Sequence, residues 1–296
     1  MPEVLPGALY IVATPIGNLS DISDRARTTL AAVDLIAAED TRHSARLLHH
    51  FSIKTPIISL HDFNEAERSR MLIGKLSGGE SIALISDAGT PLISDPGYLL
   101  VKQARHAGVT IVPVPGPCAA MTALSAAGLA TDRFVFEGFP PSKSGARLTC
   151  FRKLNTETRT IIFYESSHRI LSSLTDMLAI FGDREAVIAR EMTKRFETIR
   201  SDCLSGLIQW IEQDEKQKLG EFVVILAGAD LQMLQATEIK RAEHLLYKFL
   251  VEISPGLSLS QAVSLVVDLT ELKKNQVYGM ALKIDQEIDQ DIDRSE

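Results

Sequence analysis

The chain of 296 residues has few cysteines and no long apolar run. Its three cysteines, Cys118, Cys150 and Cys203, are odd in number and widely spaced, which argues against a disulfide framework or a cysteine-rich zinc site. The longest apolar runs, such as residues 222–227, are far shorter than the ~20 residues that a membrane-spanning helix needs. The first residues lack the basic and apolar segments of a secretory signal. We therefore expect no membrane partner and a reducing compartment, the cytoplasm.

The short motifs of several common catalytic sites are also missing. There is no G-x-G-x-x-G after the first apolar run, no P-loop and no G-x-S-x-G elbow, which disfavours a classical dinucleotide site, a phosphate loop and a serine triad. His49 and His50 are neighbours in an expected helix and would point in different directions, so we expect no metal. We interpret Cys118 as a small buried residue rather than a nucleophile.

Positive charge is scarce overall but unevenly distributed. The net charge of −7 argues against a nucleic-acid partner, yet the segment from Asp285 to Glu296 alone contributes −5. Residues 143–200 contain eleven Lys or Arg and seven Asp or Glu, a local net charge of +4. Such a surface can hold phosphates on an acidic protein, and a solvated mixed-charge surface is the alternative.

The first part of the chain alternates apolar runs with amphipathic stretches. This order predicts an α/β fold with a largely parallel sheet, and strands that are apolar throughout agree with a sheet covered on both faces. The expected strands are 9–13, 34–38, 57–60, 81–86 and 110–113, and the expected helices are 24–33, 41–51, 64–76, 97–107 and 119–128.

The pattern changes near residue 133 and again near residue 237. The middle part predicts a second α/β domain with a mixed sheet, and the last part predicts helices only, either a helix-turn-helix or a plain packing module. The expected domains are 1–130, 131–235 and 236–296. The expected middle strands are 134–136, 160–164, 185–189, 196–200 and 222–227, the expected middle helices are 145–154, 168–181 and 203–213, and the expected last helices are 239–251, 258–269 and 274–285.

Three loops of the first part are candidates for a ligand site. Residues 13–21, 86–97 and 114–119 follow expected strands and are rich in Gly, Pro and small polar residues. Open α/β sheets bind ligands at the carboxyl ends of their strands, so these loops predict a small-molecule cleft, with structured turns as the alternative. In the second part, residues 164–169 and 190–200 offer acids, a histidine and guanidinium groups suited to phosphates; helix capping by Ser166 or Ser167 and a surface His168 are the alternative.

Several long motifs follow one another in fixed order along the chain. They are YIVATPIGNLSDI (10–22), AEDTRHS (38–44), SDAGTPLISDPG (86–97), PGPCA (115–119), FEGFP (136–140), FYESSHR (163–169), REMTKRFE (190–197) and GEFVV (220–224). With these motifs the sequence is similar to the ribosomal RNA small subunit methyltransferase I group of the tetrapyrrole methylase superfamily over residues 8–228, and less distinctly over KKNQVY (273–278). Two positions depart from the family pattern, which commonly has Pro at Ser167 and Ser at Cys118, and these bear on loop geometry more than on activity.

The resemblance implies a reaction and an architecture. It implies methyl transfer from S-adenosylmethionine to the ribose 2′-hydroxyl of a cytidine in small-subunit (16S) ribosomal RNA. The implied fold has two α/β domains of the tetrapyrrole methylase type with the cofactor in the cleft between them, as a homodimer acting on ribosomal RNA or the small ribosomal subunit. A tetrapyrrole or protein methyltransferase of the same superfamily and a non-enzymatic RNA-binding protein are the alternatives.

The resemblance also implies site residues. The candidates for removing the hydroxyl proton are Glu165, His168 and Glu191, and Arg169, Lys194 and Arg195 are expected to hold RNA phosphates. The methyl group on a sulfonium is already activated, so no metal is expected. The expected cofactor-binding residues are Pro15, Asp87, Ala88, Gly89, Ile93, Ser94, Asp95, Ala119, Thr122 and Tyr164.

Overall fold

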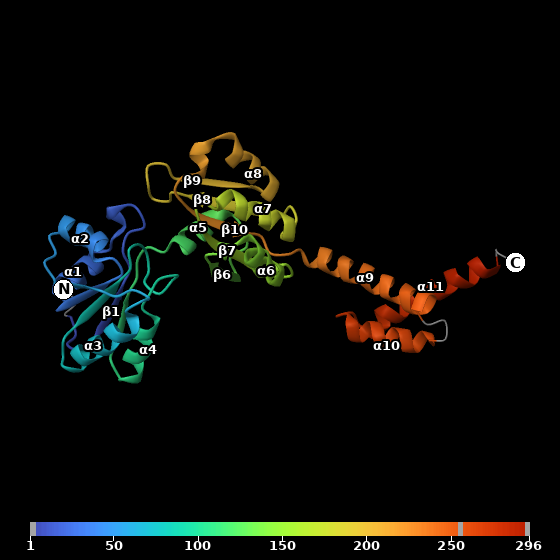
Figure 1. The fold of residues 1–296 in the computed structure, drawn as a ribbon, viewed down its shortest axis with the longest axis horizontal. Helices are drawn as coiled ribbons and strands as arrows, with labels where there is room; N and C mark the ends of the chain where they lie inside the picture. The colour runs from blue at the N-terminus through green and yellow to red at the C-terminus, as the bar shows by residue number, and fades with distance from the viewer. Residues whose placement is uncertain (1–3, 254–256, 294–296) are drawn as a thin grey trace. The chain divides into compact units, whose positions relative to one another are not determined.

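The computed structural model describes residues 4–253 and 257–293. The chain forms two compact units, Met1–Ala227 and Gly228–Glu296. The first unit contains two five-stranded sheets, and the second is helical. We describe each unit by itself (Figure 1).

The first sheet is entirely parallel, with strand order β3-β2-β4-β1-β5. One face packs against α1 and α2 through residues such as Leu30 and Leu48, and the other packs against α3 and α4 through residues such as Leu72 and Leu100 (Figure 1). The expected parallel α/β sheet is therefore confirmed. The elements are β1 Leu9–Val12, η1 Leu19–Asp21, α1 Asp24–Ala32, β2 Leu35–Ala38, α2 Thr41–His50, β3 Ile57–Ser59, α3 Glu65–Ser77, β4 Ile82–Ile85, α4 Tyr98–His106 and β5 Ile111–Val114.

The strand order creates a topological switch point between β1 and β4. These strands are neighbours in the sheet, but β1 leads to α1 on one face and β4 leads to α4 on the other. The loops after the two strands therefore diverge and leave a crevice at the carboxyl edge, which is where open α/β sheets bind ligands.

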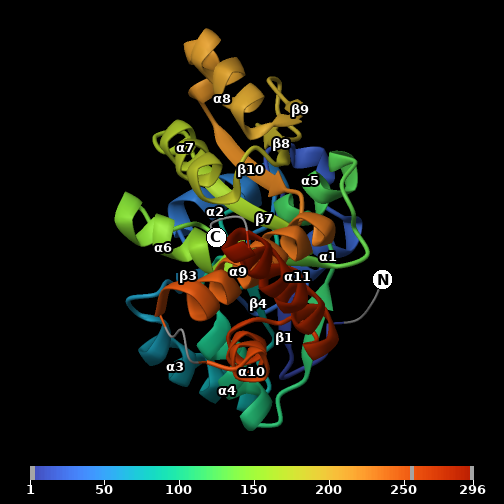
Figure 2. The same ribbon diagram turned by 90° about the vertical axis from the view of Figure 1, so that its right-hand side faces the viewer.

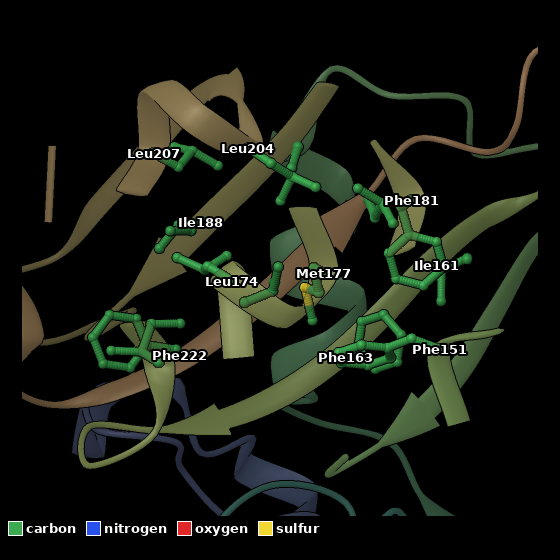
Figure 3. Packing of buried hydrophobic residues seen from close by; sticks show 14 of the residues in the cluster. Phe151, Ile161, Phe163, Leu174, Met177, Phe181, Ile188, Leu204, Leu207 and Phe222 are labelled. Atoms are coloured by element: carbon green, nitrogen blue, oxygen red, sulfur yellow. The ribbon is translucent and has the colours of Figure 1, made fainter. Parts of the chain in front are cut away.

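The second sheet is mixed, with strand order β6-β7-β10-β8-β9 and one parallel pair, β6 with β7. Helices α6, α7 and α8 cover one face, where Phe151, Phe163 and Met177 pack together (Figure 3). The mixed α/β arrangement matches the sequence prediction. The elements are β6 Phe134–Gly138, α6 Ser144–Leu154, β7 Thr160–Ser166, α7 Ile170–Phe181, β8 Glu185–Arg190, β9 Thr198–Cys203, α8 Leu204–Gln213, η2 Glu215–Lys218 and β10 Glu221–Leu226.

Helix α5, Ala119–Ala127, covers the other face of the second sheet. Ala120, Ala123 and Leu124 pack against Ile162 and Val223 of β7 and β10. From its place after the fifth strand, this helix was expected to belong with residues 1–130. The second sheet buries its small apolar face instead. The loop 114–119, which precedes the helix, therefore runs from the first half of the unit to the second.

The second unit consists of α9 (Leu231–Tyr247), the π-helical η3 (Lys248–Ile253), α10 (Leu259–Leu269) and α11 (Lys274–Asp293). Helices α10 and α11 pack against each other, around Val263, Val266 and Val277 (Figure 2). Helix α9 begins earlier than the expected 239, because the Asp230 side chain accepts a hydrogen bond from Gln232 N and caps it.

Two further features concern the second unit. Ser258 caps α10 and completes a capping box with Gln261. Of the acidic segment 285–296, residues 294–296 lie outside the described residues, and the side chains of 287–293 are not described either. Among the helices that the structure describes, none is long and apolar enough to cross a membrane.

Candidate active site

A cavity of about 480 Å³ lies at the switch point, between the loops of the first sheet and the edge of the second. The first half contributes side chains from the loops after β1, β2 and β4. The second half contributes the start of α5, the ends of β6 and β7, and the neighbouring parts of β10 and the turn after β8. The lining residues are Ile16, Glu39, Asp87, Ala88, Gly89, Thr90, Ile93, Ser94, Asp95, Cys118, Ala119, Phe139, Tyr164, Glu165, Ser166, Ser167, Met192, Gly220, Glu221, Phe222 and Val223.

The loops after β1 and β4 are joined at one point by backbone hydrogen bonds. Thr14 N donates to Gly89 O at 2.9 Å, and Gly89 N donates to Thr14 O at 3.0 Å. Gly89 has a φ of +83°, which side-chain-bearing residues rarely adopt, although an added Cβ would meet no atom closer than 3.4 Å. The backbone conformation, more than lack of space, therefore explains a glycine at this part of the cavity wall.

Three carboxylates from the first half line the cavity: Glu39, Asp87 and Asp95. Burial, followed by the charges of Asp95, Asp87 and Asp62, raises the pKa of Glu39 to about 7. Burial is also the main cause that raises the pKa of Asp95 to about 6, against an opposing hydrogen bond from Ser86. Asp87 Oδ1 accepts a hydrogen bond from Asp40 N at 3.0 Å, which links the loops after β2 and β4.

An aromatic wall from the second half faces these acids. The Tyr164 hydroxyl oxygen accepts a hydrogen bond from Ala120 N at 3.1 Å, so it ties β7 to the start of α5. The rings of Phe136 and Phe139 meet the Tyr164 ring edge to face, with centroids 4.9 and 5.5 Å away. Burial raises the pKa of Tyr164 to about 12, so the phenol is neutral at physiological pH. The cavity thus offers an apolar, aromatic surface opposite an acidic one.

Glu165 lies on the cavity wall but is held by a cation. Its side chain is fully buried, and its Oε1 is 2.9 Å from Arg169 Nη2 and accepts a hydrogen bond from Ser166 N at 2.8 Å. Arg169 Nε also donates to Ser166 Oγ at 3.1 Å. Glu165 Oε2 is buried and has no hydrogen-bond partner among the described residues. The carboxylate therefore fixes the Arg169 guanidinium at the start of α7.

Helix α7 does not use a serine cap. Its N-cap position is Arg169, without a side-chain cap hydrogen bond, so the capping role considered for Ser166 and Ser167 is wrong. Both serines line the cavity, whereas His168 is exposed and does not.

The turn after β8 contains a second cation, Lys194, that forms ion pairs with acidic side chains. Lys194 Nζ lies 2.9 Å from Glu191 Oε1 and 2.8 Å from Glu221 Oε2. Burial by itself raises the pKa of Glu191, but hydrogen bonds from Lys194 and from the backbone of Glu221 outweigh it and lower the pKa overall. Arg195 is exposed, and its guanidinium carbon lies 5.6 Å from the centroid of the Phe196 ring. The two cations of this turn that were expected to hold phosphates therefore differ in their surroundings. Arg195 is exposed, whereas Lys194 is paired with two acids.

The same turn packs against the loop after β1. Gly17 has a φ of +152°, and an added Cβ would lie 2.6 Å from Lys194 Cγ and 2.9 Å from Thr193 Oγ1. This close approach brings the two halves of the first unit together beside the cavity.

A smaller cavity of about 270 Å³ lies beside the first and shares Asp87 with it. It carries two exposed basic side chains of α2, His43 and Arg46. The remaining lining residues are Thr14, Pro15, Gly17, Leu19, Ser44, Leu47 and Ser86.

The structure brings together most residues expected to bind the cofactor. Pro15 lines the smaller cavity instead, and Thr122 is exposed on α5, where its hydroxyl donates to Cys118 O at 2.9 Å. Among the candidate bases, Glu165 lines the larger cavity and Glu191 does not. The eight that line the larger cavity are Asp87, Ala88, Gly89, Ile93, Ser94, Asp95, Ala119 and Tyr164.

Sequence reasoning missed several lining residues, above all Glu39, Phe139, Met192 and Glu221. Glu39 directly follows the buried strand β2 within the motif at 38–44, and that position at the carboxyl end of a parallel strand could have indicated it. Among the described residues, no group of three or more His, Cys, Asp or Glu is placed to hold a metal ion.

Comparison with known proteins shows the family to which the chain belongs. The family model of the tetrapyrrole (corrin/porphyrin) methylases matches residues 8–207, and the chain belongs to this family of methyltransferases. Over 94% of its length the chain is 51% identical to ribosomal RNA small subunit methyltransferase I of Haemophilus influenzae, of which it covers 97%. It is 50% identical to the protein of the same name from Escherichia coli O157:H7, covering 94% of this chain and 95% of that protein. The resemblance inferred from the motifs is thus confirmed.

Solved structures agree with the fold alone. Diphthine synthase superposes with a TM-score of 0.56 at 15% identity, over 74% of this chain and 90% of that one. Uroporphyrin-III-C-methyltransferase from Thermus thermophilus gives a TM-score of 0.53 at 18% identity, over 75% of this chain and 94% of that one. At such low identity the two proteins support the two-sheet architecture and carry no information on the acceptor.

Proposed function

We propose that the protein transfers a methyl group from S-adenosylmethionine to small-subunit ribosomal RNA, at the ribose 2′-hydroxyl of a cytidine. The cavity at the switch point carries this proposal, because its chemistry fits the methyl donor. The donor has an aromatic base, a ribose and positive charge at its sulfonium and amino groups, and the cavity offers an aromatic wall opposite three carboxylates. The names of the relatives that are about half identical to this chain support the choice of RNA as acceptor.

When bound, the donor supplies a methyl group that is already activated by the positive sulfur. The protein then has to position the acceptor hydroxyl against the methyl group of the donor. The loop 87–95, Ala119 and Tyr164 would hold the donor, and the backbone bridge between Thr14 and Gly89 would keep the two loops of that wall in place. Such alignment of an acceptor hydroxyl with the reactive methyl is worth ~7–11 kcal/mol in well-oriented reactions.

The contacts divide the candidate bases by role. Glu165 and Glu191 are each bound to a cation, so we infer that they position Arg169 and Lys194 rather than accept the hydroxyl proton. His168, which is exposed, is the remaining candidate of the three. Arg169 and Arg195 would contact RNA phosphates, and Lys194 would mainly hold the turn after β8 against the loop at Gly17.

We also propose that the protein works as a homodimer in the cytoplasm. The homodimer rests on the family resemblance and the cytoplasm on the scarce, widely spaced cysteines. Light scattering of the purified protein would decide the oligomeric state.

The acceptor class can be tested by methyl transfer from the labelled donor. The protein would be offered small ribosomal subunits, naked small-subunit RNA, a tetrapyrrole and a protein carrying the diphthine precursor. We expect label only in the RNA fraction, and no label after heat inactivation of the protein. Label in a tetrapyrrole or a protein would refute the RNA assignment. Binding of RNA that is indifferent to the donor, without label in any acceptor, would indicate a non-enzymatic RNA-binding protein.

A further inference from the structure

The larger cavity has an unusual balance of charge. Five carboxylates line it, and no Lys, Arg or His is among its lining residues in the part of the chain that the structure describes. Two of the acids pair with cations that do not line the cavity, Glu165 with Arg169 and Glu221 with Lys194, which Glu221 shares with Glu191. The other three, Glu39, Asp87 and Asp95, form no ion pair with any described residue. The wall built by the first half is therefore anionic and unbalanced.

The three charged groups that act on Glu39 come from two other loops, and all of them are acids like Glu39 itself. Asp87 and Asp95 belong to the loop after β4, and the exposed Asp62 belongs to the loop after β3. The nearest basic side chain in sequence, Arg42, pairs with Asp40 at 3.5 Å. Together with burial, this surrounding raises the pKa of Glu39 to about 7 and that of Asp95 to about 6. A carboxyl group with a pKa of about 7 is about half protonated at pH 7.

One oxygen of Glu165, unpartnered in the described part of the chain, indicates that the cavity binds a ligand with a positive or hydrogen-bond-donating group. Glu165 is 2% exposed and lines the cavity, yet its Oε2 has no partner among the described residues. Leaving a buried carboxylate oxygen without a partner is unfavourable, and a bound ligand that donates to it would remove that cost.

We propose that Glu39, Asp87 and Asp95 form an anionic wall that recognises the positive sulfur of the methyl donor and raises the affinity for the donor relative to its demethylated product. This inference rests on the proposed function, since it assumes that the donor occupies this cavity. Methyl transfer breaks the carbon–sulfur bond and leaves its electron pair on sulfur, so the product carries one positive charge fewer. The wall thus discriminates between the two by charge, because their shapes differ by only one methyl group.

Thermodynamic linkage gives the wall a measurable signature. A bound cation lowers the pKa of a neighbouring carboxyl group, so binding releases protons, and the affinity rises with pH until the group is ionised in the free protein. If the donor lowers the Glu39 pKa from about 7 by about one unit, binding at pH 7 releases about 0.4 proton. The same shift makes the affinity about fivefold higher at pH 8.5 than at pH 6. The product should release less, because it lacks the charge on sulfur.

Isothermal titration calorimetry of the full chain with S-adenosylmethionine and S-adenosylhomocysteine tests this inference. Titrations at pH 6, 7 and 8.5, each in two buffers of different ionisation enthalpy, count the protons released. The informative variant is Glu39→Gln. By reciprocity, a one-unit pKa shift corresponds to an about tenfold affinity contribution from the Glu39 charge at pH 8.5 and about twofold at pH 6. For the product, Glu39→Gln should change the affinity by less than about threefold.

Asp62→Asn is the matched control. Asp62 acts on Glu39 through its charge but does not line the cavity. This variant should shift proton release to slightly lower pH and leave the donor-to-product affinity ratio at pH 8.5 unchanged.

The inference is overturned if donor and product release the same number of protons, or if Glu39→Gln weakens both equally. Continued labelling of ribosomal RNA in that case would leave the proposed function intact. If the protein bound neither compound, the inference and the proposed function would fail together.

Discussion

The role of Glu165 can be decided by one conservative substitution, Glu165→Gln. The variant keeps the side-chain shape but removes the negative charge that lies 2.9 Å from Arg169. The glutamine oxygen can still accept from Ser166 N, which now donates to Glu165 Oε1 at 2.8 Å. The principal loss is therefore the charge that fixes the guanidinium.

The contacts set the expected magnitude. Removing one partner of a fully buried pair costs ~3–5 kcal/mol. Here the Arg169 side chain is 26% exposed and is still bound by Ser166, so its charge is partly solvated after the change. We expect the free energy of unfolding to fall by about 1–2 kcal/mol, measured by urea denaturation at neutral pH.

Binding and single-turnover kinetics then separate the two possible roles. If Glu165 positions Arg169 for an RNA phosphate, RNA affinity should fall by roughly tenfold, while single-turnover methyl transfer at saturating RNA stays within about threefold of the unmodified protein. If Glu165 were the general base, turnover would fall by ~10²–10⁴-fold with nearly normal binding of both substrates.

Arg169→Gln provides the matched partner for a double-mutant cycle. Because the two residues act through one contact, the double variant should bind RNA no more weakly than Arg169→Gln alone. Additive losses of affinity, or a large fall in turnover with unchanged RNA affinity, would refute the positioning role.

Three further predictions concern other contacts of the first unit. Gly17→Ala should lower donor affinity in calorimetry, and it should lower the free energy of unfolding by ~1–3 kcal/mol, because the new Cβ would displace Lys194 and the φ of this position is unfavourable for alanine. Unchanged affinity and stability would contradict the close approach. Glu65→Ala should cost about 2–3 kcal/mol in urea denaturation, because its carboxylate accepts hydrogen bonds from the backbone N–H groups at the start of α4, at 2.8–3.4 Å, and a loss below ~0.5 kcal/mol would refute this cap. Arg195→Ala should reduce the salt slope of RNA binding by up to ~0.9, whereas Lys194→Ala should change it less and destabilise the fold more; the reverse order would show that Lys194 holds the phosphate.

Much of the fold follows from local pattern. The buried strands of the first sheet, such as Leu35–Ala38 and Ile82–Ile85, are apolar at every position, as expected of strands covered on both faces. The glycine- and proline-rich loops at 13–21 and 86–97 identified most of the larger cavity's first-half wall, with Glu39 as the exception. Both features are encoded within about ten residues of sequence, and for that reason they could be predicted.

The remaining features depend on pairings between distant segments. Lys194 was expected to hold phosphates, but its ammonium meets Glu221, 27 residues further along the chain, across neighbouring elements of the second half. Glu39 owes its raised pKa to burial and to acids from two other loops. Helix α5 follows the last strand of the first sheet and packs against the second. Short-range periodicity carries no information on any of these three.

We propose that the switch-point cavity delivers a methyl group to the ribose of a cytidine in small-subunit RNA. The most direct test is mass spectrometry of nucleosides from small ribosomal subunits that have been incubated with the protein and isotopically labelled S-adenosylmethionine. The unmodified protein should form one labelled species, 2′-O-methylcytidine. Gly89→Val should form none, because the positive φ of this position in the cavity wall disfavours a valine side chain. A labelled methyl group on a nucleobase, on another nucleoside or on a ribosomal protein would contradict the proposal.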